Sequence, residues 1–501
     1  MSTESTGGLA SQLIHHLPVL QIIVPLIAAP TLVFLGKRLA WIFSTAVSFI
    51  SLAISIGLLS LATAGEPIYY KLGGWAAPVG IVYKVDLANS LMLLIVSMVA
   101  AVVMVYARQS VAHEIPRDRH HFFYSALLLC MTGLMGIAIT GDAFNVFVFL
   151  EISSLSAYAL IAMGRSPRAL TAAYRYLVIG TIGGTFILLG IGMLYMMTGT
   201  LNMEDLAARI PAVAEKSTVR AAFAFMTVGS LIKLALVPLH FWLPNCYTYA
   251  PSVVSAFLSA TATKISFYVL LRIIFTIFGV SLLAQTMKME ALLMFLSLVA
   301  IVGCSMVAIY QSNVKRLLAY SSLAQIGYFV LGLSLNNETA LTGSLIHLFN
   351  HALMKGGLFM VMGCVAYRLG GTRMQDMAGL GKRMPFTMFA FVLGGLGMIG
   401  VPLTAGFVSK WYLVLGAIEA GYWWVGGVLL GASLLALSYI WRVVEVAYFH
   451  DPPDDRRQEA PLGMLIPTWA MIIASIVFGI WTSPMLYISS QAAQNLLEGL
   501  R

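Results

Sequence analysis

The sequence predicts an all-α integral membrane protein of about 14 transmembrane helices, and three observations carry this prediction. The chain is 60% hydrophobic, and only 10% of its 501 residues are charged, against about 25% in soluble domains. Its apolar residues form runs of about 20, the length that an α-helix needs to cross a hydrocarbon core about 30 Å thick. Lysines and arginines also alternate in density between successive loops, as in multi-pass proteins.

The apolar runs place the helices in order along the chain. The longest polar intervals, at about 64–85, 198–219 and 450–460, are too short for a soluble domain. The expected spans are approximately 12–35, 39–63, 86–107, 121–140, 143–163, 171–197, 220–244, 251–279, 289–310, 318–336, 338–369, 386–415, 423–449 and 461–490.

The basic residues predict the orientation. Loops after odd-numbered spans, with residues such as Arg117, Arg119 and Lys382, hold more than twice as many lysines and arginines as loops after even-numbered spans, where Arg272 is counted. Because cytoplasmic loops are enriched in these residues, we expect both termini on the outer, periplasmic side. The same rule explains the net charge of +9 without a nucleic-acid partner. The N-terminus lacks a basic region, so the first run is expected to remain as a helix.

Five ionisable side chains lie deep inside the spans: Glu151, Lys233, Lys264, Lys355 and Lys410. A charge at that depth costs several kcal/mol (roughly 2.5–3.5 on insertion scales) unless it is paired, hydrated or neutralised. Lysines on four different helices indicate a relay for protons or cations. A static ion pair that fixes helix packing is the alternative.

Two spans contain a central proline. Pro238 lies in GSLIKLALVPLHFWLP and Pro402 in GMIGVPLTAGFVSKW, and each stretch also carries one of the buried lysines. Proline removes a backbone donor and clashes with the preceding turn, so each helix is expected to break. Broken helices are tolerated inside a membrane where they line a cavity or are covered by protein. The breaks fall in spans seven and twelve, and this odd offset is typical of inverted repeats in transporters.

Histidines accompany the lysines. His347, His351 and Lys355 are spaced by four and form one stripe on a helix. HLFNH lacks the glutamate of a zinc-binding HExxH motif, so a hydrated proton path is favoured over a metal site, with core packing as the other alternative. His240 follows Pro238 closely, where freed backbone groups and water are expected. We expect it to act in the relay or in gating, or else to be a satisfied structural histidine.

Other patterns do not indicate cofactors. GGLGMIG (394–400) contains GxGxxG but lies in an apolar span with no preceding strand, so it favours close helix packing over dinucleotide binding. Asp142 and Asp86 open spans and are expected to be N-caps. No metal or iron–sulfur site is expected, because no CxxC occurs among the scattered cysteines Cys130, Cys246, Cys304 and Cys364.

Several long motifs together resemble a known family, the antiporter-like subunits shared by respiratory complex I, membrane-bound hydrogenases and Mrp cation/proton antiporters. They occur in family order over about 270 residues. The matching stretches are TGDAFNVFVFLEISSLSAYALI (140–161), IKLALVPLHFWLP (232–244), APSVVSAFLSATATK (250–264), NVKRLLAYSSLAQIGY (313–328), HLFNHALMKGGLF (347–359) and GVPLTAGFVSKW (400–411).

The resemblance implies a fold of 14 helices with two inverted five-helix repeats, spans 4–8 and 9–13. It implies that Glu151 pairs with Lys233 of the broken seventh helix. Lys264 and Lys410 would continue the path, with histidines such as His240 and His347 between them. The expected units are therefore N-terminal helices 1–3 (1–120), the first repeat (121–279), the second repeat (289–449) and C-terminal helix 14 (461–501).

The resemblance also implies a function, namely an ion-translocating subunit of a multi-subunit complex in a prokaryotic cell (inner) membrane. Asn245 and Tyr247 stand where complex I members usually have Asp and His, and the tyrosine resembles the D subunit of Mrp antiporters. We therefore expect exchange of protons for Na⁺ or another monovalent cation, beside other membrane subunits.

The alternative within the family is a proton-pumping subunit of complex I or of an energy-converting hydrogenase. Because the chain has no redox ligand set and no nucleotide site, any redox catalysis would come from partners. A stand-alone carrier or a scaffold without an ion path is the alternative of another class. The intramembrane lysines argue against the scaffold.

Overall fold

The computed structural model describes residues 4–279, 289–452 and 457–498, without the side chains of 4–12, 37 and 38. The outer ends of the two terminal units expected from the sequence therefore lie outside the described residues. The elements are α1 (Glu4–Ala64), β1 (Ile68–Lys71), η1 (Leu72–Gly74), β2 (Val82–Val85), α2 (Leu87–Glu114), η2 (Arg117–Arg119), α3 (His120–Ile139), α4 (Ala143–Ala162), α5 (Pro167–Thr198), α6 (Met203–Val213), α7 (Ser217–Leu234), α8 (Leu243–Tyr249), α9 (Ser252–Leu271), η3 (Arg272–Phe278), α11 (Met289–Ile309), α12 (Val314–Ser334), α13 (Glu338–Leu369), η4 (Met374–Met377), α14 (Leu380–Arg383), α15 (Pro385–Ile399), α16 (Ala405–Glu419), α17 (Trp423–Phe449), α18 (Leu462–Ile480) and α19 (Ser483–Glu498).

The membrane class predicted from the sequence is confirmed, and the number of spanning helices differs by one. Within the described residues, 13 helices are long and apolar enough to cross a membrane. The expected twelfth span instead holds two 15-residue helices, α15 and α16. Each is only about 22 Å long, less than the hydrocarbon core. The chain turns between them through Gly400 and Leu403, whose φ angles are 88° and 71°.

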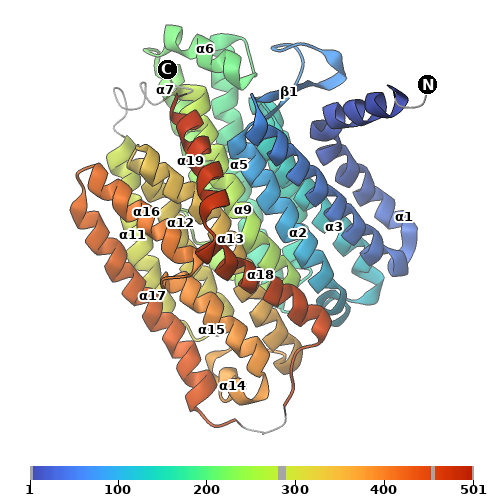
Figure 1. The fold of residues 1–501 in the computed structure, drawn as a ribbon, viewed down its shortest axis with the longest axis vertical. Coiled ribbons are helices and arrows are strands. Elements are labelled where there is room, and N and C mark those ends of the chain that lie inside the picture. The colour runs from blue at the N-terminus through green and yellow to red at the C-terminus, as the bar shows by residue number, and fades with distance from the viewer. Residues whose placement is uncertain (1–3, 280–288, 453–456, 499–501) are drawn as a thin grey trace.

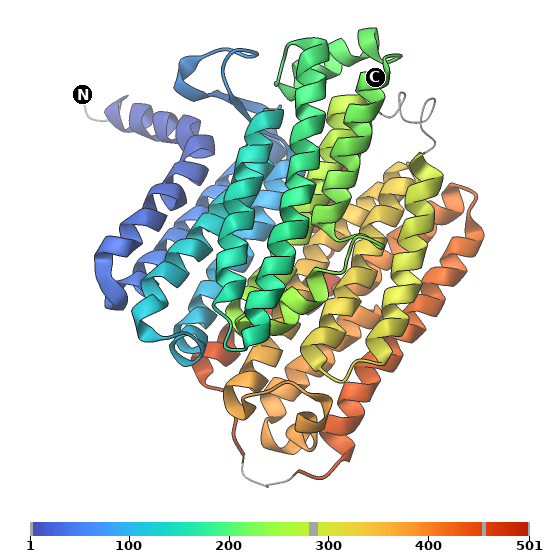
Figure 2. The same cartoon turned by 180° about the vertical axis from the view of Figure 1, so that it is seen from behind.

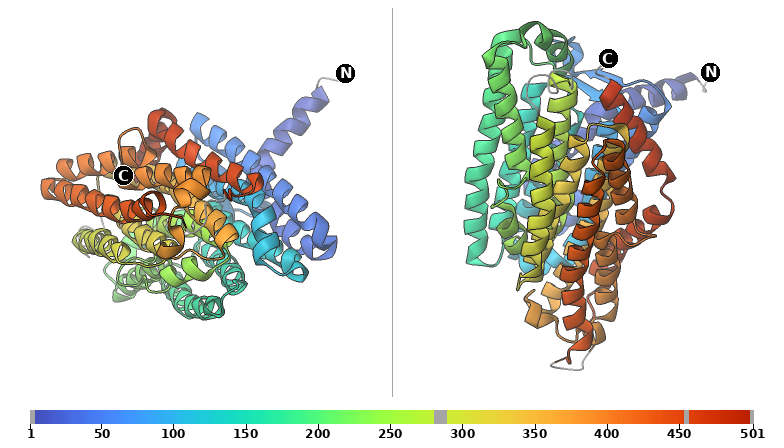
Figure 3. Two further views of the ribbon diagram at one scale, coloured as in Figure 1. Left: turned by 90° about the horizontal axis from the view of Figure 1, so that it is seen from below. Right: turned by 90° about the vertical axis from the view of Figure 1, so that its left-hand side faces the viewer.

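The helices form one elongated bundle (Figure 1). α1 contains two crossings, because Gly36 reverses the chain with a φ of 73°. Both crossings pack on α2 and α3 at one edge of the bundle, and α17 lies at the opposite edge (Figure 3). The antiparallel β1–β2 hairpin and α6 cover the upper end in Figure 1, where α1 also begins and α19 ends. In the view from behind, α5 runs up to α6 (Figure 2).

α13 is the central helix of the bundle. The most apolar 18-residue window of this helix is entirely buried, and the helix packs against α9, α12, α15, α16, α18 and α19. Gly356 and Gly357 allow α18 to approach closely, because an added Cβ would lie 2.7 Å from Met471 and 2.6 Å from Ile472. The polar side chains of α13 are consequently held in the middle of the protein.

Some features occur twice along the chain. α5 and α13 each have 32 residues and end at a glycine with a φ of 73°. α4 follows Asp142, which forms a β-bridge with Asn202, and α12 follows Asn313, which bridges Arg373 at the same sequence separation. The first bridge adjoins α6 and the second precedes α14, and these helices lie at opposite ends of the bundle (Figure 1).

Candidate functional site

Glu151 of α4 and Lys233 of α7 form an ion pair inside the bundle. Lys233 Nζ lies 3.7 Å from Glu151 Oε1, and their side chains are 5% and 24% exposed. The same ammonium donates to Ser154 Oγ at 2.8 Å. Gly184 of α5 lies against the carboxylate, since an added Cβ would be 2.4 Å from Glu151 Oε1. The structure thus brings together the two side chains that the family resemblance pairs.

The end of α7 explains why a lysine is tolerated there. α7 ends at Leu234, one residue after Lys233, and Ala235 follows with a φ of 60°. The last carbonyls of a helix lack intrahelical partners and carry a partial negative charge. A cation in the last turn is therefore stabilised before any ion pair is counted.

A small cavity adjoins Lys233, and four serines line it among mostly apolar side chains. Its volume is about 30 Å³, enough for one or two water molecules. The α9 residues on its wall, including Leu258, Ala262 and Ile265, share one helical face. Lys264 points to roughly the opposite side by helical geometry, where its Nζ donates to the Ser259 carbonyl. The cavity and Lys264 are thus separated by the width of α9.

The histidine stripe of α13 is completely buried. His347 makes two hydrogen bonds, through Nδ1 to Ser409 Oγ at 2.7 Å and through Nε2 to Gln325 Oε1 at 2.8 Å. Because an amide oxygen only accepts, Nε2 carries a proton, and Nδ1 of the neutral ring accepts from the serine hydroxyl. These two partners fix the ring in one orientation.

His351 and Lys355 lie beyond His347 on the same stripe. The two imidazole centroids are 5.9 Å apart, and neither ring nitrogen of His351 has a hydrogen-bond partner among the described residues. Lys355 Nζ donates to the Leu318 carbonyl at 2.8 Å and to Ser321 Oγ. Lys264 lies on α9, which packs against α13.

Lys410 of α16 is bound by the end of α15. Its Nζ donates to the carbonyls of Met398 at 3.0 Å and Ile399 at 2.9 Å, and to Ser433 Oγ at 3.2 Å. It also lies 5.1 Å from the centroid of the Tyr328 ring. The lysine therefore caps a helix C-terminus from within the protein, where the helix dipole favours a cation.

His240 lies apart from this line. It occupies the segment between α7 and α8, where it is half-buried and stacks on Phe241, which is 70% exposed. Pro238 precedes it in the same segment, and Pro402 lies between α15 and α16. None of the contacts recorded for the described residues joins His240 to a lysine.

Two N-caps predicted from the sequence are confirmed. The Asp142 side chain accepts from the Asn145 backbone at 2.7 Å, and that of Asp86 accepts from the Asn89 backbone at 3.0 Å. Arg272 requires a correction, because it is not a loop residue. It is buried at the end of the eighth span, with Nη2 2.5 Å from Asp86.

The sequence interpretation also missed Gln325 and Ser409, the two side chains that hold His347. Gln325 could have been found from the sequence, because its side-chain amide lies inside an apolar span. Ser409 directly precedes Lys410 in the sequence, and its role depends on the packing of α16 against α13. Hydroxyl groups are common in transmembrane helices, so neither residue stands out in the sequence.

Comparisons with known proteins identify the family. Residues 140–436 match the model described as NADH:quinone oxidoreductase/Mrp antiporter, TM. A relative from Desulforudis audaxviator named NADH-quinone oxidoreductase subunit N is 42% identical over 94% of this chain and 97% of its own length. A Bacillus subtilis relative, named as the D subunit of a Na(+)/H(+) antiporter, is 30% identical over 97% of this chain and 98% of its own.

Solved structures agree in fold. A chain of the membrane-bound sulfane sulfur reductase, described as an archaeal respiratory membrane complex, superposes with a TM-score of 0.88 and 31% identity, over 96% of this chain and 98% of its own. A chain of the Mrp complex from Dietzia sp. DQ12-45-1b also gives a TM-score of 0.88, at 26% identity over 97% and 98%.

Proposed function

Because the chain belongs to the NADH:quinone oxidoreductase/Mrp antiporter family of membrane proteins, we propose that it translocates protons as one subunit of a multi-subunit membrane complex. The observation that carries this proposal is the intramembrane Glu151–Lys233 pair, whose lysine lines a small cavity together with four serines. Intramembrane ionisable residues that pair and line a cavity are typical of proton relays. The similar chains from the Mrp and sulfane sulfur reductase complexes support a place among other membrane subunits.

In this proposal Glu151 holds Lys233 in its protonated state. When the influence of the carboxylate is withdrawn, Lys233 releases its proton toward Lys264 and the stripe of His347, His351 and Lys355. Lys410 takes the proton at the far end of the line, and His240 acts as a gate beside the Pro238 break. Because the titrations of Glu151 and Lys233 are coupled, a movement of the carboxylate charge causes a movement of a proton from the lysine.

We further propose that residues 121–279 and 289–449 are two inverted five-helix repeats, flanked by helices 1–3 (1–120) and helix 14 (461–501). The equal lengths of α5 and α13 support this division, as do the two equivalent bridges at opposite ends of the bundle. The breaks at Pro238 and Pro402 would be equivalent positions of the two repeats. Both termini would face the periplasm.

A direct test of the relay is replacement of the ion pair. Glu151→Ala and Lys233→Ala should each abolish transport in vesicles while the complex remains assembled. Lys382→Ala is the matched control, because that lysine is 64% exposed and lies 3.7 Å from Asp451 outside the bundle core. Normal transport by both pair variants would overturn the proposal.

The complex to which the chain belongs determines what drives proton translocation, a cation gradient or electron transfer. Exchange of protons for Na⁺ or another monovalent cation is the first form of the proposal, supported by the relatives named as D subunits of Na(+)/H(+) antiporters. A redox-driven pump is the second, favoured by the 42% identity to a relative named NADH-quinone oxidoreductase subunit N.

Vesicles from an antiporter-deficient strain that expresses the whole gene cluster separate the two forms. A pH change that depends on Na⁺ supports exchange. Activity that needs a redox substrate and ignores Na⁺ supports the pump.

A further inference from the structure

Four cavities follow one another from Lys233 to the end of the bundle that carries α6 and the β1–β2 hairpin. The first is the small cavity at Lys233. The second, which we call the neck, has a volume of about 20 Å³ and shares Ile137, Ile187 and Val269 with the first. Successive cavities therefore have common walls, and the series begins at the ion pair of the proposed relay.

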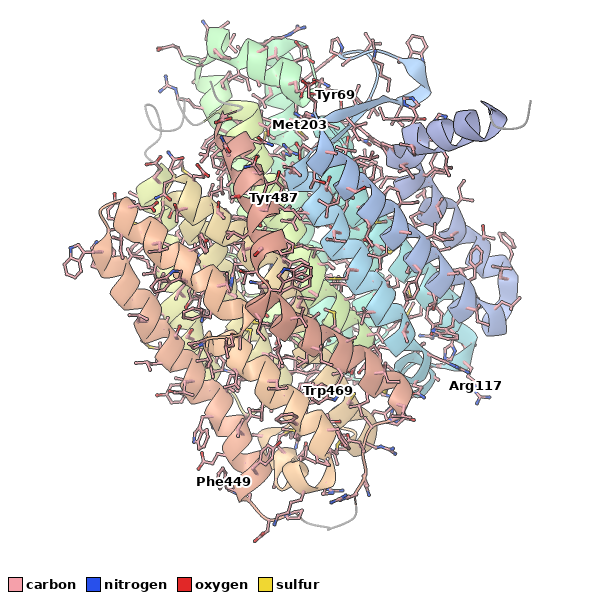
Figure 4. All side chains as sticks on the ribbon, in the orientation of Figure 1. Tyr69, Arg117, Met203, Phe449, Trp469 and Tyr487 are labelled. Atoms are coloured by element: carbon pink, nitrogen blue, oxygen red, sulfur yellow. The ribbon has the colours of Figure 1, made fainter. Side chains whose placement is uncertain are left out.

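The outer two cavities are larger and charged. The third has a volume of about 140 Å³ and shares Met203, Tyr268 and Arg272 with the neck. The fourth, the vestibule, measures about 600 Å³ and shares Lys84, Glu204, Arg272 and Thr276 with the third. Figure 4 places Tyr69 and Met203, which line the third cavity, at the upper end of the molecule.

The neck is apolar except at its outer end. Isoleucine, valine and methionine side chains of α3, α4, α5, α6, α7, α9 and η3 form most of its wall, and its volume is close to that of a single water molecule. Hydrophobic constrictions of this size gate ion pathways by excluding water. The neck therefore separates the water-sized site at Lys233 from the charged outer cavities.

Arg272 stands where the neck opens into the third cavity. Its Nη2 contacts Asp86 at 2.5 Å, and its Nε donates to Tyr268 Oη at 2.7 Å, which in turn donates to the Ala138 carbonyl at 2.9 Å. Arginine stays protonated in proteins, so this residue is a fixed positive charge across the opening. Asp86 neutralises that charge. Arg272 also begins the π-helical segment η3, a geometry frequent at functional sites.

We propose that this series of cavities is the route by which protons pass between Lys233 and the face that carries α6, and that the neck with the Arg272–Asp86 pair is its gate. The inference rests on the proposed function, whose relay it connects to one side of the membrane. Arg272 and Asp86 are positioning residues, because the proton travels with water and not through the guanidinium. Other charged groups of the outer cavities are Lys84 and Glu204, 2.7 Å apart, Lys71 at the third cavity and Glu498 at the vestibule.

Cysteine accessibility tests the route without requiring transport. Thr276→Cys lies in the outer cavities and Val269→Cys in the neck, each in a background whose four buried native cysteines are replaced. A membrane-impermeant methanethiosulfonate should label Thr276→Cys from the α6 face and label Val269→Cys at least about tenfold more slowly. An unlabelled Thr276→Cys, or equal labelling of the two sites, would overturn the inference.

Charge variants test the gate. Asp86→Asn keeps an N-cap, since asparagine caps as well as aspartate, but leaves Arg272 uncompensated, and proton flux should fall about tenfold. The double variant Asp86→Asn/Arg272→Gln removes both charges and should leak protons and expose Val269→Cys. The gate would be overturned if Asp86→Asn kept wild-type proton flux and the double variant neither leaked protons nor exposed Val269→Cys to the reagent.

Asp205→Asn/Arg209→Gln is the matched control. It removes a 2.8 Å pair on the surface of α6, outside the four cavities, so it should neither leak nor expose Val269→Cys. The outcomes also separate the two proposals. If Lys233→Ala transports normally while Thr276→Cys is labelled, the relay fails; if the relay variants are inactive while Thr276→Cys is protected, only the route fails.

Discussion

Lys233 and Lys410 are both buried lysines next to interrupted helices, yet different groups hold their charges. Lys233 faces a carboxylate, Glu151, at 3.7 Å. Lys410 faces two backbone carbonyls at the end of α15 and one hydroxyl. A carboxylate can be protonated or displaced, whereas the carbonyls of a helix end cannot. The first lysine therefore has an adjustable environment and the second a constant one.

The largest expected effect comes from removing the adjustable partner. Glu151→Gln should lower the rate of proton transport about 100-fold, because an unpaired buried charge costs about 3 kcal/mol. Ser433→Ala should lower it only about fivefold, since one hydrogen bond contributes about 1 kcal/mol and both carbonyls remain at Lys410. Proton uptake by vesicles measures both. Equal losses would break the contrast between the two lysines.

A smaller effect should follow from moving the carboxylate without removing it. Gly184→Ala places a methyl group 2.4 Å from Glu151 Oε1, so the side chain must move, and transport should fall about tenfold. Gly192→Ala on the same helix is the control, because nothing lies within 4 Å of its added Cβ. Reduced transport in the control would show that α5 itself, and not the carboxylate, had been disturbed.

Removing the partners of His347 should have a smaller effect than moving the Glu151 carboxylate. Gln325→Leu or Ser409→Ala leaves a buried ring nitrogen without a partner, which costs about 1–3 kcal/mol. We expect transport to fall about fivefold in each variant. An unchanged rate in both would mean that the orientation of this ring does not matter to the relay.

The smallest effect concerns an ion pair outside the spans. Burial alone would raise the pKa of Glu204, but the hydrogen bond and charge of Lys84 and the hydroxyl of Tyr69 hold it below its ordinary value. The pKa of Tyr69 is raised to about 12 by burial and by Glu204, so its hydroxyl stays a donor at neutral pH.

A depressed carboxyl pKa stabilises the fold above the unfolded value, and that stabilisation is lost as pH falls through the folded value. Glu204 is 47% exposed, so Glu204→Gln should lower the free energy of unfolding by only about 0.5 kcal/mol at pH 7. At pH 3 the difference should shrink. Denaturant unfolding in detergent measures this difference. A loss of about 3 kcal/mol, the cost of an unpaired buried charge, would contradict the distinction between buried and exposed pairs.

The sequence predicted much of the fold because apolar length is a local property. Thirteen of the expected spans each hold a helix of sufficient length. The twelfth does not, because the chain turns at Gly400 and Leu403, whose φ angles exceed 70°, on either side of the proline at which the sequence predicts a break. The last expected span likewise divides at Ile480, where α18 ends before α19.

The site was only partly predictable. Buried lysines are costly wherever they occur, so Lys233, Lys264, Lys355 and Lys410 stood out by composition. The Glu151 pairing came from the family resemblance, because no local pattern joins two distant helices. The sequence predicts Arg272 in a loop, because the orientation rule counts every basic residue near the end of a span as part of a solvated loop.

α9 stands between the cavity at Lys233 and Lys264, which does not line that cavity and donates to the Ser259 carbonyl. An electric field passes through such a wall, but a proton must go around it. A change of charge at one lysine can therefore alter the electrostatic potential at the other before a proton reaches it. A delay between the electrical response and proton arrival would be the kinetic sign of that separation.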